Sequence, residues 1–155
     1  MITVNEVRRA VIQSLDSRFP EMRIYGEEIK QGLQEPCFFV QLFPVSQERE
    51  LGRRYKRYHA FDIHYFPSVP TPGEPESAND EMHAMAEQLY DVLEYITVSG
   101  SLLRGTGMNH EMINGILHFF VDYNIHLMRP RPDSPVMRAL DQEARINERA
   151  TTGSK

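Results

Sequence analysis

The sequence predicts an α+β fold in which a four- to five-stranded, mostly antiparallel sheet carries two long helices on one face. Two segments repeat their apolar residues with the spacing of a helix, and others alternate apolar and polar residues as strands do. An Asn-Gly pair between two strand-like runs is typical of a tight hairpin. The predicted order of elements is α-β-β-β-α-β-β-α.

The first helix is predicted over Thr3–Phe19. Its apolar stripe consists of Val4, Val7, Val11 and Leu15. Thr3 followed three residues later by Glu6 fits a capping box, in which each side chain binds the other residue's backbone N–H. Pro20 cannot continue a helix, so the helix is expected to end before it.

The first strands follow this helix. A short strand is predicted at Met22–Tyr25, and the polar segment Glu27–Gln34 is expected to be a loop. The aromatic and branched run Cys37–Phe43 predicts a strand that is buried on both faces. The long alternation over Arg53–Phe66 predicts a second strand antiparallel to it. The charged connection Pro44–Gly52 is expected to be an exposed loop.

A second helix is predicted over Asp80–Ile96, capped by Asn79 or Ser77 and ended by Gly100. Its predicted buried stripe consists of Met82, Met85, Ala86, Leu89, Leu93 and Ile96. The segment Pro67–Glu76 before it holds four prolines, so it can support neither a helix nor a sheet ladder. It is expected to be a surface crossover.

The last predicted strands are Leu102–Ile113 and Ile116–Arg129, joined by Asn114-Gly115. The second of them alternates most regularly of all segments. Gly105 and Gly107 predict a bulge or bend in the first.

The chain is divided on this basis into one domain, 1–130, and a C-terminal arm, 131–155. The arm is expected to hold a short helix over about Pro135–Arg149 and a polar tail.

Composition restricts the class of protein. The chain has 155 residues and a net charge of −5, with 41% hydrophobic and 25% charged residues, as in an ordinary soluble domain. A bulk polyanion should be repelled on average. One cysteine excludes an internal disulfide and is consistent with a reducing cytosol. No signal peptide and no run of roughly 18 apolar residues is visible, so no membrane partner is expected.

The sequence predicts no catalytic residue, no metal site and no cofactor. His118 and His126 share a strand face but lie about 26 Å apart at about 3.3 Å per residue. His59 and His64 should point to opposite faces. A cross-strand pair, such as His64 with His118 or His126, stays open. Cys37 lies among aromatic residues and is interpreted as a small buried hydrophobe.

A cluster of cations and tyrosines supplies the only candidate site. The candidate interface residues are Glu48, Glu50, Arg53, Arg54, Tyr55, Lys56 and Arg57. Three interpretations fit: an interface with another protein or subunit, where Arg and Tyr are favoured, an edge strand protected by charge, or a strand that binds nucleic acid. Adjacent acidic and basic patches suit a head-to-tail contact that closes into a ring.

Five segments of the sequence resemble the small tail terminator proteins of phage and prophage tail clusters in Gram-positive bacteria. They are Met1–Val7, Tyr25–Gly32, Glu35–Leu42, Glu50–Tyr55 and Phe61–Phe66. The resemblance is good over the first half of the chain and looser over the second hairpin.

The resemblance implies a structural protein. Six copies would form a homo-oligomeric ring on the head-proximal end of the tail tube, stop the polymerisation of tube subunits, and join the tail to the neck or connector. The implied partners are the tail tube protein and neck, connector or sheath proteins, with DNA only passing through. The implied location is a virion or tail-like particle assembled in the host cytoplasm.

Two alternatives stay open. One is another head–tail connector or neck adaptor of similar size. The other is a small nucleic-acid-binding regulator that uses the basic strand 53–57.

Overall fold

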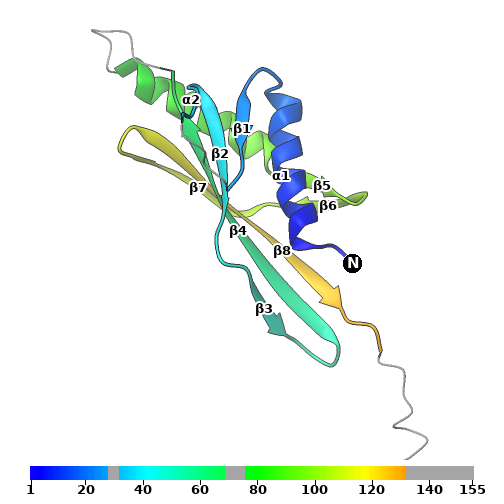
Figure 1. Ribbon diagram of the computed structural model, residues 1–155. Coiled ribbons are helices and arrows are strands. Elements are labelled where there is room, and N and C mark those ends of the chain that lie inside the picture. Colours follow the sequence, from blue (N-terminus) through cyan, green and yellow to red (C-terminus); the bar gives the residue numbers. More distant parts are fainter. Residues whose placement is uncertain (28–31, 69–75, 132–155) are drawn as a thin grey trace, which may run out of the picture.

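A computed structural model describes residues 1–27, 32–68 and 76–131 of the chain. In this part, two helices and a small hairpin lie on one face of a six-stranded, twisted sheet (Figure 1). The fold is therefore α+β with both helices on one side of a mostly antiparallel sheet, as predicted. No helix in these three segments is long and apolar enough to cross a membrane.

The helices are α1 (Val4–Arg18) and α2 (Glu76–Val92). The strands are β1 (Arg23–Tyr25), β2 (Cys37–Leu42), β3 (Ser46–Arg49), β4 (Arg54–Phe66), β5 (Tyr95–Val98), β6 (Ser101–Arg104), β7 (Thr106–Ile113) and β8 (Ile116–Met128).

The sheet is built around β4 and β8, which pair antiparallel from Arg54↔Met128 to Tyr65↔Leu117. The strand order is β1-β2-β4-β8-β7, with β3 beside the first half of β4. Among the strands of the described segments, only β1 runs parallel to its neighbour, β2. The Asn114-Gly115 turn joins β7 to β8 with φ values of 52° and 74°, which confirms the hairpin predicted from these two residues.

Helix α1 forms as its sequence predicts. The Thr3 side chain accepts a hydrogen bond from the Glu6 backbone N–H, and the Glu6 carboxylate accepts one from the Thr3 backbone N–H. These reciprocal bonds pair two of the N–H groups that a helix start leaves without partners. Three of the four residues of the predicted stripe, Val7, Val11 and Leu15, are fully buried, whereas Val4 in the first turn is half-buried.

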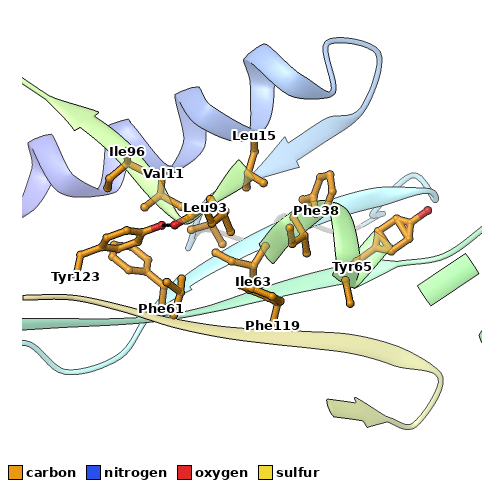
Figure 2. Packing of buried hydrophobic residues seen from close by; sticks show 14 of the residues in the cluster. Val11, Leu15, Phe38, Phe61, Ile63, Tyr65, Leu93, Ile96, Phe119 and Tyr123 are labelled. Carbon is orange, nitrogen blue, oxygen red and sulfur yellow. Dashed lines mark hydrogen bonds between the residues drawn. The ribbon is translucent and has the colours of Figure 1, made fainter. Parts of the chain in front are cut away.

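The core lies between the helices and the sheet (Figure 2). Phe61, Ile63 and Tyr65 of β4 and Phe119 and Tyr123 of β8 all point into it, as the alternation of these strands predicts. The buried Tyr123 hydroxyl donates a 2.6 Å hydrogen bond to the Leu93 carbonyl (Figure 2). This bond ties the end of α2 to the central strand.

The predicted exposed loop at Pro44–Gly52 is wrong in part, because residues 46–49 form β3. Strand β2 ends at Leu42, so the first residues of β4 have no partner on that side until β3 fills the edge. All four β3 residues are exposed and polar, and a strand without an apolar face leaves no period-two signal in a sequence.

Two elements in the second half also differ from the prediction. Helix α2 begins at Glu76, so Ser77 and Asn79 lie inside it and are not caps, and it ends at Val92. Ile96 is buried as predicted, but from strand β5. The predicted strand at 102–113 is divided at Gly105 into β6 and β7. The helix predicted over 135–149 lies outside the described residues.

Gly105 permits this division through close packing. A Cβ at this position would lie 2.6 Å from the Leu93 carbonyl oxygen and 2.9 Å from a Val121 methyl group. We expect Gly105→Ala to lower the free energy of unfolding by about 1–3 kcal/mol, the usual cost of overpacking. Urea unfolding followed by circular dichroism would measure it.

Gly26→Ala is the matched control, because its nearest new contact would be an ordinary 3.5 Å to an arginine side chain. It should change stability by no more than about 0.5 kcal/mol. Equal effects of the two substitutions would contradict the packing argument.

Candidate functional site: a projecting arm

One end of the sheet extends beyond the helices (Figure 1). It consists of β3, the turn after it, the first residues of β4 and the last residues of β8. We call residues 46–58 and 124–129 the arm. All seven interface candidates from the sequence lie on it.

The tip of the arm is a tight turn. The Glu50 N–H donates to the Arg54 carbonyl at 2.8 Å, and the Arg49 side chain donates to the Gly52 carbonyl at 2.9 Å. Leu51 sits at the top of the turn and is 89% exposed. A leucine in this position has no partner within the described part of the chain, and it is not among the seven interface residues predicted from the sequence.

Strand alternation divides the charges of the arm between its two sides. The side that continues the helix-covered face carries Arg49, Arg53, Tyr55, Arg57 and Arg129, and we call it the arginine face. Arg57 donates twice to the Gln47 side-chain oxygen, at 3.0 and 2.8 Å. The Arg129 guanidinium lies 5.0 Å from the centre of the Tyr55 ring, and Arg53 donates to the Arg129 carbonyl.

The arginine face lacks balancing negative charge. Among the described residues, none of its four arginines forms an ion pair with a carboxylate. Arg49, Arg53 and Arg57 donate hydrogen bonds to uncharged groups, and the Arg129 guanidinium lies over the Tyr55 ring. These contacts fix the guanidinium positions without neutralising their charge. Such a face is suited to an acidic partner, to which Arg can donate in a bidentate manner.

The opposite side of the arm is mixed in charge. It carries Glu48, Glu50, Arg54, Lys56, Tyr58 and His126. The Glu48 carboxylate accepts a hydrogen bond from the Tyr58 hydroxyl, and the Glu50 carboxylate lies 2.7 Å from His126 Nδ1. The Lys56 ammonium lies 5.0 Å from the centre of the Tyr58 ring. We call this the mixed face.

The structure therefore separates residues that are contiguous in the sequence. Of the candidates, Arg53, Tyr55 and Arg57 belong to the arginine face, and the others belong to the mixed face. Arg129 was missed, although its position two residues after Leu127 on a regular strand would have placed it on the arginine face.

Helix α2 carries the opposite charge. It contains five acidic residues and neither Lys nor Arg. Asp80, Glu87 and Asp91 are exposed and follow one side of the helix, opposite its buried residues. The start of α2 lies at the other end of the molecule from the arm (Figure 1).

A family model described as "Phage tail terminator protein" matches residues 6–135. The chain belongs to the phage tail terminator family. It is thus a structural component of a phage tail, interacts with other tail proteins, and is part of a virion or tail particle. This membership agrees with the resemblance noted in the sequence.

Comparisons with curated proteins and with solved structures do not bear on the family. No protein of curated function matches the chain. A solved structure of 12% sequence identity aligns over 86% of this chain and 100% of its own, with a TM-score of 0.42.

The cysteine and histidines of the chain have different surroundings. Cys37 is fully buried, and burial raises the pKa of its thiol, which confirms its interpretation as a small hydrophobe. His83 and His110 meet on the helix side, and His126 contacts Glu50. His64 lies directly opposite His118, which realises one of the cross-strand pairs left open by the sequence.

His59 lies at the base of the arm and is fully buried. Its Nδ1–H donates to the Tyr123 carbonyl at 3.0 Å, while its Nε2 is buried with no partner in the described structure. Burial lowers the pKa of His59 below its ordinary value of 6.5; the charge of Arg57 acts in the same direction and the hydrogen bond to Tyr123 opposes it. The neutral imidazole is therefore the form that fits.

This lowered pKa makes stability dependent on pH. The unfolded chain binds the proton more readily, so the contribution of neutral His59 is complete above about pH 6.5 and is lost as the pH falls toward the folded-state pKa. We expect His59→Asn, which keeps a donor near the Nδ1 position, to show a shallower fall in unfolding free energy between pH 7 and pH 5. Urea titrations at several pH values would measure the slope.

Phe61→Leu is the control for a general loss of packing, because it changes a buried residue of the same strand without a titrating group. It should lower stability by a similar amount at each pH. A wild-type slope in His59→Asn would refute the role of His59.

Proposed function

We propose that six copies of this chain form a ring at the head-proximal end of the tail tube, where the ring stops tube polymerisation and joins the tail to the neck or connector. The observation that carries this proposal is the match to the tail terminator family over most of the chain. The proposed particle is encoded by a phage or prophage of a Gram-positive host and is assembled in the host cytoplasm.

The contact between subunits is proposed to join the arginine face of one arm to the acidic outer side of α2 on the next subunit. The two surfaces have opposite charge and lie at opposite ends of one chain. A contact between two different surfaces is heterologous, and its repetition closes into a ring when the rotation between neighbours permits. Charge complementarity of this kind also selects the correct partner during assembly.

The mixed face and the exposed Leu51 at the tip are left free by this contact. We assign them to the tail tube, sheath or neck proteins, which completes the proposed role of Glu48, Glu50, Arg54 and Lys56. The C-terminal arm predicted over residues 131–155 is distinct from the projecting arm of residues 46–58 and 124–129. We propose that it is a separate segment that follows the domain 1–130. The net charge of −5 suits a ring through which DNA passes without adhering.

A charge swap tests the contact. Arg53→Glu/Arg57→Glu makes the arginine face acidic, and Glu87→Arg/Asp91→Arg makes α2 basic. We expect each double variant alone to lose rings, with the subunit concentration needed for assembly raised at least about tenfold, because desolvated ion pairs are replaced by repulsion. Mixing the two variants should restore alternating rings, since each then supplies the complement of the other.

Light scattering with size-exclusion chromatography and negative-stain microscopy would score the rings. The matched control is Arg54→Glu/Lys56→Glu, which reverses two charges on the mixed face of the same strand. This control variant should still form rings, but its rings should attach more weakly to the tube or neck. Rings that survive Arg53→Glu/Arg57→Glu, or that fail equally in the control, would contradict the assignment of the subunit contact.

The arginine face also favours nucleic acid as a second candidate partner, since Tyr55 lies between Arg53 and Arg57. Duplex DNA binding at physiological salt, with a steep salt dependence that is lost in Arg53→Glu/Arg57→Glu, would support a regulator instead. A ring-forming protein without such binding would exclude it.

A further inference from the structure

The face of the sheet away from the helices carries a cluster of three metal-binding side chains. Asp62 and His64 are two residues apart on β4, so they point to the same side. His118 is paired directly with His64 from the neighbouring strand β8. Two long central strands thus hold the three side chains in position, and no loop is involved.

Their ligand atoms converge. The Asp62 Oδ2 atom lies 3.0 Å from His64 Nε2 and 2.9 Å from His118 Nδ1. All three ligand atoms lie within 4.8 Å of one another. The side chains are largely buried, with 7% of Asp62, 16% of His64 and 15% of His118 exposed.

One of these atoms has no satisfactory partner. His64 Nε2 is buried and makes no hydrogen bond within the described structure, although the Asp62 carboxylate lies 3.0 Å from it. A buried nitrogen without a partner is rare in folded proteins and calls for an explanation. An ion between the three groups would accept its lone pair.

Aromatic rings surround the cluster and hold the imidazoles. The Phe39 ring meets His64 edge-on at 5.2 Å, and the Phe120 ring stacks beside His118 at 6.3 Å. The centres of the His64 and His118 rings lie 4.3 Å apart. A rigid set of ligands in an apolar surround favours binding, because little order is lost when the ion enters.

We propose that Asp62, His64 and His118 bind one divalent transition-metal ion of the zinc class. Two imidazole nitrogens and one carboxylate oxygen suit such ions, whereas Mg²⁺ and Ca²⁺ prefer oxygen ligands alone. Ligands about 2.0–2.2 Å from a tetrahedral ion lie roughly 3.3–3.6 Å apart. The two Asp62–histidine distances of 3.0 and 2.9 Å therefore need to open by roughly half an ångström to admit the ion. The ion would join β4 to β8 on the side that the helices leave uncovered.

This site departs from the absence of metal expected from the sequence. The spacing of His118 and His126 excludes a site within one strand, but the pairing of His64 with His118 creates one between two strands. Asp62 shares a face with His64 in the alternation of this strand, but only the pairing of β4 with β8 brings His118 to both of them.

Metal binding by the full chain without an affinity tag would test the proposal. Zn²⁺ titration by calorimetry and Co²⁺ absorption spectroscopy should give one ion per chain. His64→Gln and His118→Asn, which remove the coordinating nitrogens, should each weaken binding at least about tenfold. Zn²⁺ should raise the melting temperature of the wild type, but not that of the double variant.

His126→Gln is the matched control, because it removes a histidine from the same face of β8 that contacts only one carboxylate in the described structure. It should bind Zn²⁺ as the wild type does. If the His64 and His118 variants fail to fold, ¹⁵N spectra of wild-type imidazoles decide instead: Zn²⁺ should shift the signals of His64 and His118 and leave that of His126 in place. No stoichiometric binding, or equal loss in the control, would overturn the proposal.

Discussion

The pairing of β4 with β8 is the constraint on which the rest of this structure depends. Both strands have 13 residues and stay in register from the arm to the far end of the sheet. A shift of one residue would exchange the faces of every side chain on the shifted strand, moving Phe119 and Tyr123 out of the core. The core, the separation of charge on the arm and the Asp62 cluster all follow from this register.

The length of these two strands also explains the arm. The helices cover only part of the sheet, so the strands continue past the core (Figure 1). There they need other contacts to hold them in place. Strand β3 supplies these contacts by pairing with the exposed edge of β4. Side chains alternate between the two sides of each strand. Over the core this alternation separates apolar from polar residues, whereas in the arm it separates the arginine face from the mixed face. This arrangement suits a protein whose role in a phage tail depends on contacts.

The two buried polar residues of the described chain, His59 and Asp62, both belong to β4. They point to opposite faces and are stabilised differently. His59 is held neutral by burial and by a single backbone partner. For Asp62, burial acts to raise its pKa, but the adjacent His64 and His118 outweigh that effect and lower it, so the carboxylate stays ionised. Buried polar groups are costly wherever they lie, and the presence of both on β4 indicates that this strand has a role besides packing.

The sequence by itself determined the helix α1 with its capping box, the strands β2, β4 and β8, the hairpin at Asn114-Gly115 and the α+β class, because each has a local periodic or turn signal. It also located the charged residues of the arm. Only the tertiary structure decided that residues 46–49 form a strand, that α2 ends at Val92, and that His64 and Asp62 meet His118. These features depend on which strand lies beside which, and the free energy of such pairing comes from residues far apart in the chain, so no local pattern records it.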